Sequence, residues 1–148
     1  MNVESSPSST GRRRASAVGA WALVATGVLH AASVAVGTAT EAPAAQRAVH
    51  DAMAATHVAV AGLDRTLWQL FLGFSLTMAL FIAGLGALNL LALRRAPRLF
   101  VDTRAALWLN LGIVLPAFAV AVLAFPPPPI ALLAVAGAAF GYALTRKP

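Results

Sequence analysis

The chain has 148 residues, of which 59% are hydrophobic and only 11% are charged. Soluble globular domains carry roughly 25% charged residues, so this composition is typical of a membrane protein. The net charge of +6 does not indicate nucleic-acid binding, because the basic residues form short clusters between apolar runs instead of covering one face. The absence of cysteine excludes disulfides, a thiol nucleophile and thiolate metal ligands.

The N-terminal part divides into a polar tail and a first apolar segment. Residues 1–14 are rich in serine and end in three arginines, so we expect a disordered tail. Residues 15–38 are apolar over a length that suits a membrane-spanning helix, which needs about 20 residues. A cleaved signal peptide over residues 1–39 is the alternative, but its apolar core would exceed the usual roughly 7–15 residues.

Residues 40–63 are more polar and cannot span a membrane. Pro43 is typical of a helix start and Gly62 of a helix end. Val49, Met53 and Val60 recur near helical spacing, which predicts an amphipathic helix on the membrane surface.

Three further spans are predicted after this segment. Residues 65–93 and 105–125 are long and apolar enough to cross a bilayer. The four prolines at 126–129 predict a stiff, extended connector. We expect Pro129 to open the last span, residues 129–144, because proline is well tolerated in a first helical turn.

The predicted fold is therefore all-α, an integral membrane four-helix bundle over residues 15–145 with an amphipathic helix in the first extracytoplasmic loop. Nine of the eleven basic residues lie in the tail, between the second and third spans, or at the C-terminus. The other two are Arg47 and Arg65. The positive-inside rule then predicts that both termini, and with them the tail, lie in the cytoplasm.

One group of residues resembles a known family. Gly27-x-x-His30 lies in the first span, and Arg65-Thr66-x-Trp68, followed by Gly73-Phe74, opens the second. These motifs resemble a family of small bacterial four-span membrane proteins of unknown function, with the resemblance covering residues 20–125. Leu67 and Gln69 replace a tyrosine and an acidic residue of the family motif. The resemblance implies the four-span fold and a location in the bacterial cytoplasmic (inner) membrane, but no activity.

The N-terminal end of the second span carries most of the candidate ligand-binding residues. Arg65, Trp68 and Gln69 would form the rim of an outward-facing pocket, where Arg65 attracts a phosphate or carboxylate. The alternative is a simple helix start, in which Asp64 caps the helix and Thr66 supports it. His30 is the fourth candidate, because an ionisable side chain within a span usually faces the bundle interior; the alternative is a histidine that only packs.

His50, His57 and Asp64 recur at intervals of seven residues. On one continuous helix each interval rises about 10.5 Å, too far for shared ligation of a zinc ion. We therefore predict no metal site, and interpret these residues as a solvated helix face. Within the apolar runs, Asn89 and Asn110 are expected to form a hydrogen bond between adjacent helices.

The residues do not assemble into a nucleophile with a base, paired intramembrane carboxylates or a phosphate-binding glycine loop. We therefore assign no catalytic residue and no cofactor, and an enzyme is not the first hypothesis. We expect a structural or interaction role, or the binding of a small apolar ligand or lipid between the first and second spans. The expected partners are membrane lipid, a second copy of the chain or another membrane protein. The alternative is a membrane-embedded enzyme or proton-coupled carrier that acts on a lipid-like substrate through His30 and Arg65.

Overall fold

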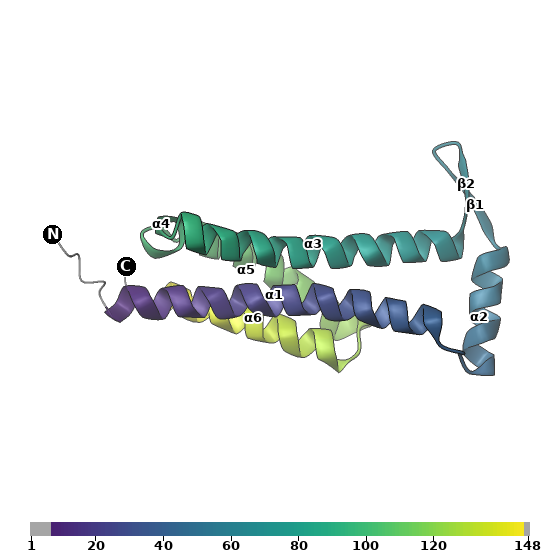
Figure 1. Ribbon diagram of the computed structural model, residues 1–148, viewed down its shortest axis with the longest axis horizontal. Coiled ribbons are helices and arrows are strands. Elements are labelled where there is room, and N and C mark those ends of the chain that lie inside the picture. Colours follow the sequence, from purple (N-terminus) through teal and green to yellow (C-terminus); the bar gives the residue numbers. More distant parts are fainter. Residues whose placement is uncertain (1–6, 147–148) are drawn as a thin grey trace. The chain divides into compact units, whose positions relative to one another are not determined.

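The computed structural model describes residues 7–146, apart from the side chains of residues 7–9 and Val60. The described part contains six helices and one two-stranded sheet (Figure 1). Their order is α1 (Pro7–Ala39), α2 (Ala44–Ala55), β1 (His57–Val60), β2 (Leu63–Thr66), α3 (Leu67–Arg95), α4 (Arg98–Val101), α5 (Ala105–Ala124) and α6 (Pro127–Thr145). Helices α1, α3, α5 and α6 are long and apolar enough to cross a membrane, which confirms the predicted all-α class with four apolar helices.

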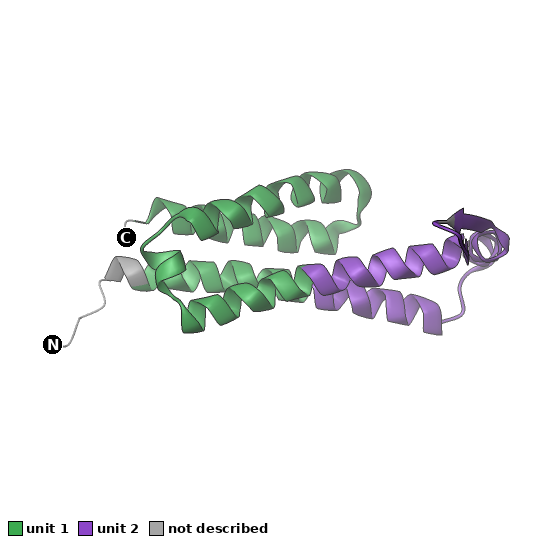
Figure 2. Cartoon of the chain, turned by 90° about the horizontal axis from the view of Figure 1, so that it is seen from above, with its two compact units in different colours: residues 1–26, 82–148 green, residues 27–81 purple. Residues whose placement is uncertain are grey.

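The chain forms two compact units, coloured separately in Figure 2. Unit 1 comprises residues 1–26 and 82–148, and unit 2 comprises residues 27–81. Unit 1 therefore contains the first part of α1, the last part of α3, and α4 to α6. Unit 2 contains the remaining parts of α1 and α3 together with α2 and the two strands.

Unit 1 has an apolar core to which all four long helices contribute. Leu23, Leu93, Leu107, Val114 and Phe140 are all buried in it. Two glycines allow close packing here, Gly86 against the backbone of α1 and Gly19 against an aromatic ring, as expected where helices associate within a membrane. A Cβ added to Gly86 would lie 2.6 Å from the carbonyl oxygen of Ala20, and one added to Gly19 would lie 2.9 Å from the Phe140 ring.

A reciprocal amide pair links α3 to α5 within this core. Asn89 Nδ2 donates to Asn110 Oδ1 at 2.6 Å, and Asn110 Nδ2 donates to Asn89 Oδ1 at 3.1 Å. Asn110 Nδ2 also donates to the carbonyl of Ala106 at 2.8 Å. The predicted hydrogen bond between the two helices is thus confirmed, and it satisfies polar groups that are costly to leave unpaired in an apolar core.

The start of α1 differs from the predicted disordered tail. Of that tail, residues 1–6 lie outside the described residues, but the helix already begins at Pro7. Arg12 explains the difference, because its side chain is fully buried and its guanidinium donates to the carbonyl of Val101 at 2.7 Å. This contact joins the first turns of α1 to the end of α4, so tertiary structure orders a segment whose composition alone favours disorder.

The last helix also begins earlier than predicted. Pro126 is extended, with φ −68° and ψ 168°, and α6 starts at Pro127 instead of Pro129. Because the first helical turn needs no backbone N–H donors, three prolines fit into it.

In unit 2 the predicted helix over residues 40–63 is shorter, and a hairpin follows it. Helix α2 ends at Ala55, and β1 pairs antiparallel with β2 so that Val58 faces Arg65 and Val60 faces Leu63. Ala61 and Gly62 form the turn with φ values of 51° and 80°. Positive φ at both central residues is the requirement of a type I′ hairpin turn. Arg65 and Thr66 therefore belong to β2, and α3 begins at Leu67 instead of Arg65.

Candidate functional site

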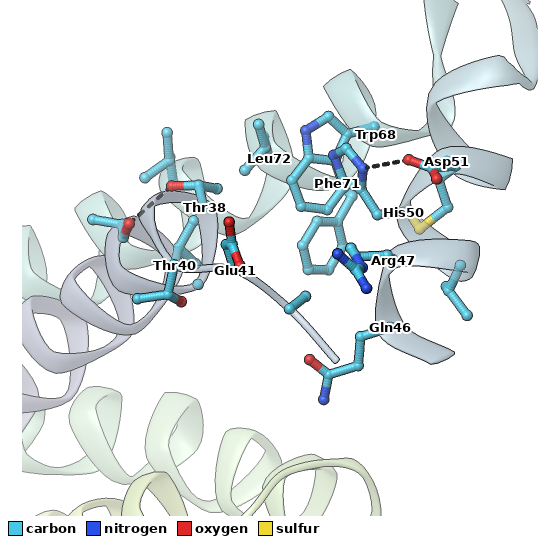
Figure 3. Close-up of a pocket in the computed structure, with 17 residues that line it drawn as sticks. Thr38, Thr40, Glu41, Gln46, Arg47, His50, Asp51, Trp68, Phe71 and Leu72 are labelled. Atoms are coloured by element: carbon cyan, nitrogen blue, oxygen red, sulfur yellow. Dashed lines mark hydrogen bonds and ion pairs between the residues drawn. The ribbon is translucent and has the colours of Figure 1, made fainter. Parts of the chain in front are cut away.

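Unit 2 contains a groove of about 960 Å³ bounded by α1, α2 and α3. Within unit 2, α2 runs across the ends of α1 and α3 (Figure 1), which fits an amphipathic helix lying at a membrane surface. The residues that line the groove are Val34, Ala35, Gly37, Thr38, Thr40, Glu41, Ala42, Gln46, Arg47, Val49, His50, Asp51, Met53, Trp68, Phe71, Leu72 and Leu76. Figure 3 shows these side chains around the hollow.

One wall of the groove is aromatic. The rings of His50 and Trp68 meet edge to face, with centroids 4.4 Å apart and planes at 77°. The Trp68 ring stacks on Phe71 with a centroid distance of 5.5 Å. Because His50 belongs to α2 and the other two residues to α3, this aromatic cluster fixes α2 against the start of α3.

Apolar residues continue this wall along the helices. Leu72 and Leu76 extend it along α3, and Val34 extends it along α1. The three residues belong to helices apolar enough to cross a membrane. A hydrocarbon chain of a ligand could therefore remain in apolar surroundings along this side of the groove.

Charged side chains also border the groove. Glu41, Arg47 and Asp51, which we call the charged rim, are all exposed. His50 Nδ1 lies 3.3 Å from Asp51 Oδ1. Glu41 and Arg47 come from different segments bordering the hollow (Figure 3), and within residues 7–146 neither forms an ion pair. A guanidinium group binds phosphate or carboxylate, whereas a carboxylate accepts hydrogen bonds from an ammonium group.

The structure distributes the four predicted site residues over different places. Trp68 lines the groove. Arg65 and Gln69 instead border a second hollow of about 570 Å³, together with Leu70, Gly73, Phe74 and Thr77. His30 lines neither hollow. Neither of these two hollows is bordered by all four candidates, and their binding roles stay predictions.

Gln69 has a clear local contact. Its side-chain oxygen accepts from the backbone N–H of Thr66 at 3.1 Å, and the Thr66 hydroxyl accepts from the backbone N–H of Gln69 at 3.1 Å. This reciprocal pattern is a capping box, which satisfies donors that a helix start leaves free. Thr66 is thus the cap of α3, and not Asp64, which the helix-start alternative favoured.

Arg65 and His30 make few polar contacts of their own. The Arg65 guanidinium donates to the carbonyl of Asp64 at 3.0 Å. His30 Nε2 is buried and has no hydrogen-bond partner among the described residues. His30 lies four residues before Val34, one helical turn along α1 from a groove-lining residue.

The histidines considered for metal binding lie on different elements. His50 is on α2, whereas His57 Nδ1 lies 2.9 Å from Asp64 Oδ2 across the hairpin. This second pair is diagonal in the register, since Asp64 faces Ala59. The described residues contain no group of three or more potential metal ligands.

Sequence reasoning missed Glu41 and Arg47 as groove residues. The sequence pattern could have indicated Arg47, because Arg47 and His50 are three residues apart and so share a face of the amphipathic α2. The capping box was also readable, since Thr66-Leu-Trp-Gln69 follows the Thr-x-x-Gln pattern. That α2 borders a groove with α1 and α3, however, depends on tertiary structure.

Comparison of the chain with protein-family models, curated proteins and solved structures found no match in any of the three. The resemblance to small bacterial four-span membrane proteins therefore stays a prediction.

Proposed function

We propose that this protein binds an amphipathic, lipid-like molecule in the groove of unit 2. The observation that carries the proposal is the combination, in one hollow, of an apolar wall with a charged rim. An acyl chain would lie along Val34, Leu72 and Leu76, where its burial is favourable. The head group would lie at the rim.

The rim favours a head group that carries both charges. Arg47 is suited to a phosphate, which a guanidinium group can bind with two parallel hydrogen bonds. Glu41 and Asp51 are suited to an ammonium group. A zwitterionic phospholipid such as phosphatidylethanolamine has both groups, and we propose this chemical class as the ligand.

We further propose that the protein resides in the bacterial cytoplasmic membrane with both termini in the cytoplasm. Unit 1 carries nine of the eleven Lys and Arg residues and two of the five acidic residues. Unit 2 carries Arg47 and Arg65 with the other three acidic residues. The positive-inside rule supports this topology, in which the segment between α1 and α3, and so the rim, is extracytoplasmic.

A carrier or enzyme that acts through His30 and Arg65 would need both residues at one substrate. Arg65 borders the smaller hollow and His30 borders neither, so the geometry favours binding in the groove over this alternative. The protein could instead have an interaction role, with a second copy of the chain or another membrane protein as partner. Such a role does not require that the groove binds a ligand.

Native mass spectrometry of the full chain, purified in mild detergent, tests the proposal. We expect phospholipid to remain bound, and the retention that depends on Arg47 to be stronger for phosphatidylethanolamine than for phosphatidylglycerol, which lacks an ammonium group. Arg47→Ala should weaken retention about tenfold or more, because a hydrogen bond to a charged group is worth roughly 1.5–3 kcal/mol. The matched control, Arg65→Ala, removes the other arginine of unit 2 and should retain the lipid.

Recovery of the chain without any lipid would contradict the proposal and favour the interaction role. Equal losses from Arg47→Ala and Arg65→Ala would also contradict it, since the rim would then have no special part in binding.

A further inference from the structure

A second charged hollow lies in unit 1 and is independent of the groove. It has a volume of about 690 Å³ and lies between the first turns of α1 and the segment from Pro97 to Asp102. Arg13 and Arg14 reach it from α1, and Arg98 reaches it from α4. Asp102 is the one carboxylate among the described residues that line it.

The three arginines have no carboxylate partner in the part of the chain that the structure describes. The ion pairs within residues 7–146 are His50–Asp51 and His57–Asp64, and both lie in unit 2. The side chains of Arg13, Arg14 and Arg98 are exposed. Their guanidinium donors are therefore available to a ligand, and the single carboxylate leaves the hollow with an excess of positive charge.

Arg12 holds the two sides of this hollow together. Its side chain is fully buried, with Nη1 2.7 Å from the Val101 carbonyl oxygen and Nη2 3.5 Å from that of Thr103. Phe100, which is 1% exposed, anchors α4 in the core of unit 1. These contacts hold the first turns of α1, which carry Arg13 and Arg14, beside α4, which carries Arg98, and this arrangement lowers the entropy cost of binding.

We propose that this hollow binds a phosphate ester group, such as the head group of an anionic phospholipid. Arginine forks match phosphate oxygens, and several guanidinium groups stabilise a phosphate better than a single one. The hollow also lies at a polar–apolar boundary, because Ala17 of its lining belongs to the apolar run that begins at Ala15. Basic pockets next to membrane-spanning helices bind anionic head groups in this way.

The test measures binding of phosphatidylglycerol, phosphatidylcholine and inorganic phosphate to the full chain in detergent. We expect phosphatidylglycerol to bind with saturation, and Arg13→Gln/Arg98→Gln to weaken this binding by about tenfold or more. The matched control, Arg94→Gln/Arg95→Gln, removes the same charge from residues that do not line the hollow. It should change the affinity by less than about twofold. Thermal unfolding of both variants establishes that they are folded.

Competition separates the two possible sources of the phosphate group. Displacement of phosphatidylglycerol by inorganic phosphate at millimolar concentration would assign the hollow to a soluble phosphate compound, whereas persistence of the lipid would assign it to the membrane. Equal weakening of phosphatidylglycerol binding by the two double variants, or an equal loss of phosphatidylcholine binding in Arg13→Gln/Arg98→Gln, would overturn the proposal. Neither result would affect the groove in unit 2, whose lining shares no residue with this hollow.

Discussion

Gly86 marks a close approach between α1 and α3 in unit 1. A Cβ at this position would lie 2.6 Å from the Ala20 carbonyl oxygen and 2.7 Å from the backbone nitrogen of Val24. Backbone atoms cannot move aside as a flexible side chain can, so the whole helix would have to shift. Gly84, two residues earlier on the same helix, has open space where its Cβ would be.

We therefore expect Gly86→Ala to destabilise the protein by about 1–3 kcal/mol, the usual cost of overpacking. Gly84→Ala is the control, because both substitutions gain the same intrinsic helix propensity of about 1 kcal/mol. Denaturant unfolding of both variants in one detergent measures the difference. Equal stabilities would show that α1 and α3 are farther apart at Gly86 than the structure has them.

The capping box at the start of α3 gives Gln69 a role that needs no ligand. Thr66→Ala and Gln69→Ala should each increase amide hydrogen exchange in the first turn of α3, with a cost of about 1 kcal/mol per lost cap. Gln69→Glu should leave exchange unchanged, because glutamate also accepts from the Thr66 N–H and suits a helix N-terminus. Unchanged exchange in Gln69→Ala, together with loss of bound lipid, would instead identify Gln69 as a ligand contact.

At the scale of elements, the four long helices were predictable because each is a continuous apolar run of sufficient length. The hairpin was not. Its β1 strand is only four residues long and follows an alanine-rich helix, and its turn uses Ala61-Gly62 instead of a typical Asn-Gly pair. The helical structure of the first turns of α1 could not be predicted either, because Arg12 and its partner Val101 are 89 residues apart in sequence.

The groove, too, could be predicted only in part from the sequence. That Trp68 borders a hollow could be predicted from its place at the start of an apolar helix. The participation of Glu41 and Arg47 could not, because it follows from the way α2 runs across the ends of α1 and α3, which no local pattern encodes.

Substitutions in the turn between β1 and β2 test the hairpin, which was not predicted from the sequence. Alanine at φ 51° is strained, whereas glycine adopts positive φ freely. We expect Ala61→Gly to protect the amides of β1 and β2 from hydrogen exchange, and Gly62→Ala, at φ 80°, to expose them, each by about 1 kcal/mol. Opposite or absent changes would mean that residues 57–66 do not form this hairpin in the membrane.

At the scale of the whole molecule, the distribution of charge predicts the topology. Because nine of the eleven basic residues belong to unit 1, a reporter that is active only in the cytoplasm should be active when fused after Pro148. The same reporter inserted at Gly62, in the hairpin turn, should be inactive. Activity at Gly62, or inactivity after Pro148, would reverse the orientation and place the groove on the cytoplasmic side.

Trp68 is a natural reporter for the proposed binding of a lipid-like molecule in the groove of unit 2. The chain has three tryptophans, so in the variant Trp21→Phe/Trp108→Phe the groove residue Trp68 is the only tryptophan that remains. The matched control, Trp21→Phe/Trp68→Phe, leaves Trp108, which is 63% exposed and does not line the groove.

Titration of both proteins in detergent with a brominated phospholipid, whose bromine atoms quench tryptophan fluorescence, is the most direct measurement. We predict that quenching of Trp68 saturates and is reversed by unbrominated phosphatidylethanolamine, whereas quenching of Trp108 rises in proportion to the lipid fraction without saturation. Identical, unsaturated quenching of both tryptophans would contradict lipid binding in the groove.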